Sequence, residues 1–222
     1  MKTAILIISF TLLSFLSQAQ KHLVGAYGGL NISNSLPISA SGYTDSERRL
    51  APLLGISYTN MLKEKLSLGF DLFYNARGFT QVSEITNEFG DPIPDYNREF
   101  KFEYLSMPIK LGYNLGNKIY GFGNIGVVPS FLLNSSSRVP SLFTSQGVLT
   151  YRIDDITSIS RRYDVGGLFE LGGGVKFETI WTYLSLGYQP SIIGIFNSDE
   201  SGTPYVSMHS LFLSFGIRYV IK

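Results

Sequence analysis

The sequence predicts an all-β protein, an eight-stranded antiparallel up-and-down transmembrane β-barrel preceded by a cleavable signal peptide. Three observations support this prediction. The first twenty residues have the pattern of a secretory signal. Apolar residues then alternate with small or polar ones, which is typical of strands with two different faces. Finally, the polar connectors between these segments are alternately long and short, an asymmetry that outer-membrane barrels share.

The composition excludes several other classes of protein. Only 16% of the 222 residues are charged, against about 25% in a soluble domain. The 16 Phe, 14 Tyr and single Trp argue against intrinsic disorder. A net charge of +1 gives no electrostatic reason to expect nucleic acid as a partner. The absence of Cys excludes disulfides, thiolate metal sites and a Cys nucleophile.

The N-terminal segment is predicted to be a secretory signal peptide. It carries a positive charge at Lys2, an apolar stretch over residues 4–16, and a small-x-small sequence that ends at Ala19. Cleavage there gives a signal peptide of residues 1–19 and one barrel domain of residues 20–222. The apolar stretch is too short to span a membrane, which takes about 20 residues. A buried N-terminal helix is the alternative.

Eight strands follow from the alternation. We expect them at residues 21–34, 49–60, 65–82, 98–114, 118–133, 161–178, 181–196 and 205–221. The long connectors are then 35–48, 83–97, 134–160 and 197–204, and the tight turns are 61–64, 115–117 and 179–180. Because the strand count is even and the periplasmic turns of such barrels are short, both termini are expected on the periplasmic side.

The two faces of each strand decide between membrane and water. One face is rich in Leu, Ile and Phe, whereas the other carries mostly Gly, Ser and Asn with isolated charges. A soluble barrel would need Lys and Glu on its water-facing side, so we expect the apolar face to meet lipid. Only a closed barrel satisfies the backbone there. A soluble lipocalin-like carrier is the leading non-membrane alternative.

Two groups of residues are candidate functional positions. Isolated charges on the inward face could line a narrow pore, bind a solute or pair with one another: Asp71, Lys110, Glu170 and Arg218. An eight-stranded barrel is just wide enough for side chains to fill, which favours a filled lumen over a channel. Outward aromatics near the strand ends are expected to mark the lipid interfaces, namely Tyr58, Tyr113, Phe177 and Tyr219 at the short-turn end and Tyr74 and Tyr188 nearer the long connectors.

Two irregularities accompany the alternation. Around residues 98–104 the faces exchange character, so we expect this part to project above the bilayer while Phe100, Phe102 and Tyr104 plug the lumen; a register-shifting bulge is the alternative. Prolines also interrupt strands and are expected at bulges or near a rim. They are Pro52, Pro108, Pro129 and Pro190.

Residues 102–113, FEYLSMPIKLGY, resemble the "YLxxPlxxky" strand of the PorT-like outer-membrane β-barrel family of the Bacteroidetes. Residues 120–130 are similar to the Gly-rich strand that follows it in that family. The resemblance implies an eight-stranded barrel in a Gram-negative outer membrane. It also implies a secretion-system partner, because some relatives are linked to type IX secretion. It supplies no catalytic residues.

Motifs for chemistry are weak. His209 stands beside Ser207 and Ser210, which leaves an outer-membrane lipid A hydrolase as one hypothesis. However, His209 shares a face with Leu211 and Leu213, which predicts that His209 points outward. Residues 121–126 fit GxGxxG but continue a strand where a dinucleotide site needs a helix, so no cofactor is expected. No metal site is expected either.

The expected function is therefore that of a non-enzymatic barrel with a side-chain-filled lumen. Its long extracellular loops, above all 134–160, would contact outer-membrane lipid, lipopolysaccharide or an envelope protein. A narrow channel for small solutes or ions is the first alternative, and the hydrolase is the second.

Overall fold

The computed structural model describes residues 21–37, 46–82, 86, 90, 97–144, 147–196 and 206–221. The predicted signal peptide and the connector 197–204 lie outside these residues. The described chain forms ten strands: β1 (Lys21–Pro37), β2 (Ser46–Met61), β3 (Leu66–Val82), β4 (Asn97–Ser106), β5 (Ile109–Gly116), β6 (Ile119–Thr144), β7 (Gly147–Asp155), β8 (Tyr163–Lys176), β9 (Ile180–Pro190) and β10 (Val206–Ile221).

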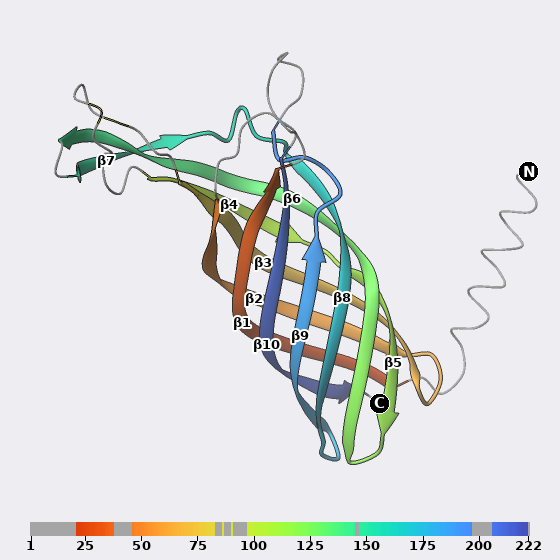
Figure 1. Cartoon of the computed structure of the whole chain (residues 1–222). Coiled ribbons are helices and arrows are strands. Elements are labelled where there is room, and N and C mark those ends of the chain that lie inside the picture. The colour runs from red at the N-terminus through yellow and green to blue at the C-terminus, as the bar shows by residue number, and fades with distance from the viewer. Residues whose placement is uncertain are drawn as a thin grey trace, which may run out of the picture.

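Antiparallel pairing closes the sheet into a barrel (Figure 1). From β1 the ring runs through β2 and β3 to β4 and β5, then through β6, β8 and β9 to β10, which pairs with β1 again. β4 and β5 are two parts of one barrel strand, because both pair with β3 and β6 and keep one register across Met107 and Pro108. The ring therefore has the eight strands that the sequence predicts, and β7 is added outside it.

The strand prolines are accommodated in two ways. Pro52 lies where the β2–β3 register shifts between Arg48 and Leu53, and Pro190 ends β9, as expected. Pro108 and Pro129 differ from the expectation, since they lie within the wall at adjacent register positions, Pro129 opposite Met107 and Pro108 opposite Val128, with no register shift beside them. Neither proline has a backbone N–H to donate to the neighbouring strand, so the two missing donors fall at the same interruption of the sheet.

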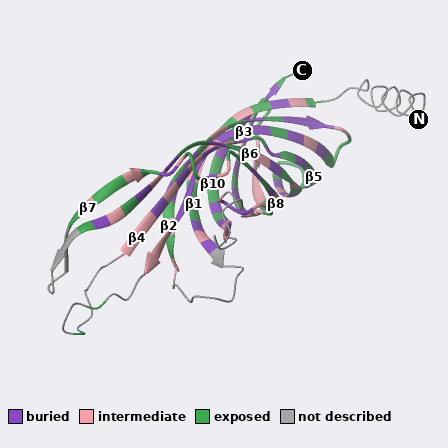
Figure 2. Cartoon of the chain, turned by 90° about the horizontal axis from the view of Figure 1, so that it is seen from above, coloured by how far each residue is buried: buried purple, intermediate pink, exposed green. Residues whose placement is uncertain are grey.

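Apolar side chains cover the outside of the barrel. Exposed and buried residues alternate along the strands (Figure 2). On β10 the outward residues are 43–56% exposed: Leu211, Leu213, Phe215, Ile217, Tyr219 and Ile221. Ser210, Ser214 and Arg218 of the same strand point inward and are buried. The predicted orientation of the two faces is confirmed.

No helix in the described part of the chain is long and apolar enough to cross a membrane.

The ends of the barrel differ as predicted, with one correction. Tight turns join β2 to β3, β5 to β6 and β8 to β9 at what we call the short-turn end, and the other connections lie at the long-connector end. Residues 134–160 are not an irregular loop, because β6 continues to Thr144 and returns as β7. Polar composition suggested a loop, but inward Ser135 and Ser137 are buried and keep the alternation. The predicted strand 181–196 ends earlier, at Pro190.

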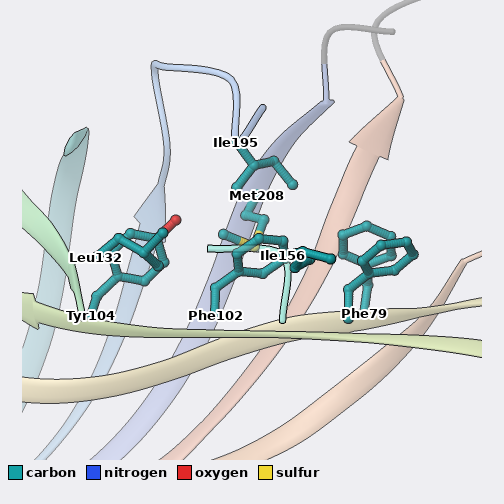
Figure 3. Packing of buried hydrophobic residues seen from close by; sticks show 8 residues of the cluster. Phe79, Phe102, Tyr104, Leu132, Ile156, Ile195 and Met208 are labelled. Carbon is teal, nitrogen blue, oxygen red and sulfur yellow. The ribbon is translucent and has the colours of Figure 1, made fainter. Parts of the chain in front are cut away.

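Three hydrophobic clusters fill the lumen between the ends. The cluster at the long-connector end contains Phe79, Phe100, Phe102, Tyr104, Leu132, Ile156, Ile195 and Met208 (Figure 3). This confirms the plug expected from the three aromatics of β4, although a register shift between Glu103 and Tyr104 is present as well. The middle cluster contains Leu53, Phe73, Val128, Leu168 and Phe212, and the third contains Leu23, Met61, Tyr120, Phe122, Trp181, Tyr183 and Val220.

Glycine on one strand makes room for an aromatic ring on the next. Gly187 pairs with Phe212 across β9 and β10, and a Cβ built at Gly187 would overlap the Phe212 ring. Gly216 is related in the same way to the ring of Tyr183. The narrow lumen thus depends on glycine for packing space.

Substituting Gly187 with Ala should lower the free energy of unfolding by about 1–3 kcal/mol, because the Phe212 ring must move in a filled core. Unfolding of the protein in detergent by urea, followed by circular dichroism, measures the loss. Gly121→Ala is the matched control, since a Cβ at Gly121 would have only the carbonyl oxygen of Gly172 as a neighbour, at 3.7 Å. Equal losses for the two variants would contradict this account of the packing.

Candidate functional site in the lumen

An ionic cluster centred on Lys110 lies within the lumen. The Lys110 Nζ donates to Asp71 Oδ2 at 2.6 Å and to Glu170 Oε2 at 3.4 Å, and all three residues are less than 8% exposed. Asn124 donates to the same Glu170 oxygen at 2.7 Å, and the Tyr27 hydroxyl donates to Asp71 at 3.2 Å. The alternation of β3, β5 and β8 brings these side chains inward to one level of the barrel.

The backbone beside Lys110 is shaped to admit its long side chain. A Cβ at Gly69, the residue paired with Lys110 on β3, would lie 2.9 Å from Lys110 Cγ. Glycine at this position lets the Lys110 stem cross the lumen to reach its two carboxylates.

Arg218 completes the predicted group of four but is held differently. Its guanidinium lies 4.2 Å from the ring centroid of Tyr183 and 5.5 Å from that of Phe122. Arg218 and Lys110 line the same cavity of about 10 Å³, which is about the room that one water molecule needs. Two buried cations thus face two buried carboxylates, so the group is neutral overall and has no excess charge to attract an ion.

A second ionic network lies nearer the long-connector end, and we did not predict it. Arg77 is fully buried and donates to Asp164 Oδ2 at 2.7 Å and to Ser191 Oγ at 2.9 Å. Ser191 donates to the same Asp164 oxygen at 2.7 Å, and the Arg77 guanidinium lies 4.3 Å from the Tyr104 ring centroid. The alternation in the sequence places both Arg77 and Asp164 on the inward face, so each could have been predicted as a lumen charge. Their contact could not, because it depends on which strands face each other across the ring.

The predicted interface aromatics point outward. Those at the short-turn end are 38–57% exposed: Tyr58, Tyr113, Phe177 and Tyr219. Phe177 lies just beyond the end of β8, and Tyr58 accepts or donates a hydrogen bond of 2.8 Å with His22 Nδ1. At the other end Tyr74 donates to Glu103 at 2.8 Å, and the Tyr188 ring lies 6.3 Å from that of His209. Their place at a lipid interface stays a prediction.

The geometry around His209 does not form a nucleophile and base pair. Ser207 lies two residues away on the same row of the strand, about 7 Å along it, which is beyond hydrogen-bond reach. Ser210 points into the lumen and is fully buried. Among the described residues, no group of three or more His, Asp or Glu side chains is placed to hold a metal ion.

A closed barrel with an apolar exterior and a filled, charged interior defines a class, the transmembrane β-barrels of outer membranes. Comparison with family models identifies the family. Residues 18–197 match the model described as "Outer membrane protein beta-barrel domain". The chain belongs to this family, and it is a protein of the cell outer membrane.

Solved structures of outer-membrane proteins are similar to this chain at low sequence identity. AlkL, determined in lipid bilayers, is 12% identical, with 92% of this chain and 91% of AlkL covered and a TM-score of 0.53. OprG from Pseudomonas aeruginosa is 12% identical over 91% of this chain and 95% of its own, with a TM-score of 0.48. Neisserial surface protein A is 12% identical, with 91% of this chain and 99% of that protein covered and a TM-score of 0.45. No curated protein matches the chain.

Removing the central cation should destabilise the barrel strongly. Lys110→Met removes the cation that Asp71 contacts at 2.6 Å and leaves two buried carboxylates facing Arg218 alone, which should cost about 3–5 kcal/mol of unfolding free energy. Adding Asp71→Asn to that variant makes the group neutral again, with Glu170 facing Arg218, and should recover most of the loss. Lys101→Met is the control, because Lys101 and Glu103 pair at a partly exposed position and should contribute less than about 1 kcal/mol. Urea unfolding in detergent measures the stability of all three variants. Equal losses for Lys110→Met and Lys101→Met would contradict the central role given to Lys110.

Proposed function

We propose that this chain is a non-enzymatic outer-membrane barrel whose lumen is closed by side chains and whose extracellular sheet contacts lipopolysaccharide and envelope proteins. The observation that carries the proposal is the contrast between the two parts of the molecule. Inside the ring, three hydrophobic clusters and two ionic networks occupy the lumen. Beyond the ring, β6 and β7 extend as a free sheet (Figure 1).

The length of β6 supports a role outside the bilayer. A tilted strand of about 9–11 residues is enough to cross a membrane, whereas β6 has 26 residues. Its outer part pairs with β4 on one side and with β7 on the other. We infer that this flared sheet, made of the outer parts of β3, β4, β6 and β7, stands on the cell surface.

Charged pairs order this flared sheet. Glu99 accepts from Arg49 at 3.4 Å and from Arg138 at 3.2 Å, and the Arg138 guanidinium lies 4.0 Å from the Tyr151 ring centroid. The Lys101 ammonium donates to Glu103 and holds the pKa of that carboxyl below its ordinary value. These contacts give a pre-formed surface.

The chemistry of the flared sheet favours partners that carry phosphate. Arginine suits bidentate contact with phosphate oxygens, and Arg138 and Arg152 both stand on this sheet at exposed positions. Ile153, which is 72% exposed, is the register partner of Arg138 and adds an apolar contact beside it. Lipopolysaccharide supplies both chemistries. Membership of the PorT-like group and a secretion-system partner belong to the same proposal and rest on the resemblance of residues 102–113.

A narrow channel is the second candidate. Buried polar atoms without a hydrogen-bond partner, Asp71 Oδ1 and Arg218 Nε among them, lie along the lumen and would suit water or a small polar solute. The hydrolase hypothesis has no comparable support, because His209 lacks a serine partner.

A filled lumen predicts an electrically silent barrel. The purified protein in a planar lipid bilayer should give no stepwise conductance, and Lys110→Ala should be equally silent if it folds. Folding is checked by the change in electrophoretic mobility that heating causes in barrel proteins. Steady single-channel currents that change with Lys110→Ala would favour the channel instead.

Shortening the β6–β7 hairpin should weaken binding of lipopolysaccharide without unfolding the barrel. Arg138 and Ile153 are register partners, so an Asn-Gly turn can replace residues 139–152 between them. We expect unchanged heat-modified mobility and at least about tenfold weaker binding of fluorescent lipopolysaccharide, since Arg152 and the Tyr151–Arg138 stack are lost. Lys118→Gln, at the opposite end, is the control. Unchanged binding by the shortened protein would contradict this part of the proposal.

A further inference from the structure

The short-turn end of the barrel encloses a cavity of about 540 Å³. Two tight turns and the ends of β1, β8 and β9 surround it, on the side where the C-terminus lies (Figure 1). It is lined by Lys21, Met61, Leu62, Lys63, Glu64, Lys65, Asn114, Gly116, Asn117, Lys176 and Trp181. We call it the basal cavity. In a barrel with periplasmic short turns, it opens to the periplasm.

The basal cavity is strongly cationic. Four of its lining residues are Lys and one, Glu64, is acidic, so the lining carries a net charge of +3. Among the described residues, none of these four Lys has a carboxylate within 4.0 Å. By contrast, Lys110 in the lumen is paired twice. Cations gathered in a concave wall of low dielectric raise the local concentration of anions.

The turns that carry the cations are fixed in place. The Asn114 side chain donates to the Lys65 carbonyl at 3.3 Å and to Ser67 Oγ at 3.2 Å, and the Asn114 amide donates to the same Lys65 carbonyl at 2.7 Å. Within the turn, the Lys63 amide donates to the Leu66 carbonyl at 3.3 Å. The β2–β3 turn is thereby tied to β5. Little backbone ordering would be needed when a ligand binds, which favours affinity.

Aromatic rings close the inner side of the basal cavity. The Lys176 ammonium lies 4.3 Å from the Trp181 ring centroid and 4.9 Å from that of Tyr120. Both rings belong to the hydrophobic cluster that fills the lumen at this level. A ligand that entered the basal cavity would therefore meet a wall. This geometry suits a binding site better than a passage.

We propose that the basal cavity binds a small multivalent anion, a compound that carries phosphate or carboxylate groups, on the periplasmic side of the barrel. Its volume lies within the range of about 300–1,000 Å³ that is usual for small-molecule sites. A net charge of +3 matches a di- or trivalent anion, and lysine is a common ligand for phosphate. This site is separate from the surface contacts proposed above, because the filled lumen lies between the two ends.

The only tryptophan of the chain, Trp181, provides a direct measurement. The full-length mature protein, folded in a zwitterionic detergent, is titrated with pyrophosphate and with citrate while the emission of Trp181 is recorded. Potassium chloride at matched ionic strength is the reference. We expect a saturable change with both anions and none with chloride.

Charge-removing variants locate the site. Lys63→Gln with Lys65→Gln should raise the Kd for pyrophosphate about tenfold or more, because two of the four cations are lost. Both side chains are exposed on a turn, so the variant should fold, which its heat-modified mobility checks. Lys118→Gln is the matched control: it removes an exposed Lys from the same end but outside the cavity, and should leave the Kd unchanged.

The same titration distinguishes a soluble anion from a lipid headgroup, which offers the same phosphate chemistry. It is repeated in vesicles of phosphatidylcholine with and without phosphatidylglycerol. An unchanged Kd identifies the soluble anion as the ligand, whereas a Kd raised only by phosphatidylglycerol identifies the headgroup as an occupant of the basal cavity. A response that does not saturate, that chloride reproduces, or that Lys118→Gln reduces as much as the double variant would overturn the proposal.

Discussion

Backbone hydrogen bonding in lipid is the constraint on which the rest of this structure depends. Each unpaired N–H or C=O in hydrocarbon costs several kcal/mol, so a sheet can cross a membrane only when its two edges meet. Here the edges meet where β1 pairs with β10 along sixteen consecutive residues, from His22 to Pro37. Closure with eight strands then fixes the width of the lumen, and the width dictates what the inward residues can be.

In a narrow lumen, inward side chains must leave packing space for one another and pair their charges. Gly187 yields space to the Phe212 ring, and Gly69 yields space to the stem of Lys110. The buried charges are also paired, because burying a lone ion in this interior would cost too much free energy of desolvation. Lys110 therefore lies between two carboxylates, and Arg77 is paired with Asp164 and stacked on Tyr104. Such networks tie together strands that are not neighbours in the ring, which adds cross-links through the lumen to those in the wall.

Local alternation made much of this fold predictable. Period two separates the outward Leu and Phe from the inward Gly, Ser and charges, and it places Asp71, Lys110 and Glu170 on the inward face without any knowledge of the partners. Which charges touch depends on the tilt and stagger of the strands, and that is a property of the closed ring. The sequence therefore predicted the members of the Lys110 cluster but missed the contact between Arg77 and Asp164. The continuation of β6 was missed for another reason, because its serine-rich composition is typical of a loop, while pairing with β4 and β7 decides its conformation.

The two ends of the barrel differ in whether their cationic side chains have carboxylate partners. Arg138 and Arg152 of the flared sheet and Arg49 of the neighbouring β2 each have a carboxylate partner, so that surface is ordered by ion pairs. In the basal cavity Glu64 is the one acidic lining residue, and in the described part of the chain none of the four lysines has a carboxylate within 4.0 Å. Lys176 donates to the Gly116 carbonyl at 3.4 Å and lies over the Trp181 ring, but neither contact neutralises its charge. Repulsion between the four lysines lowers stability, and a neutral residue at any of the four positions would reduce it. Since the filled lumen separates the two ends, the unpaired cations gain nothing from the surface sheet, and an anion bound in the basal cavity itself offers the direct compensation.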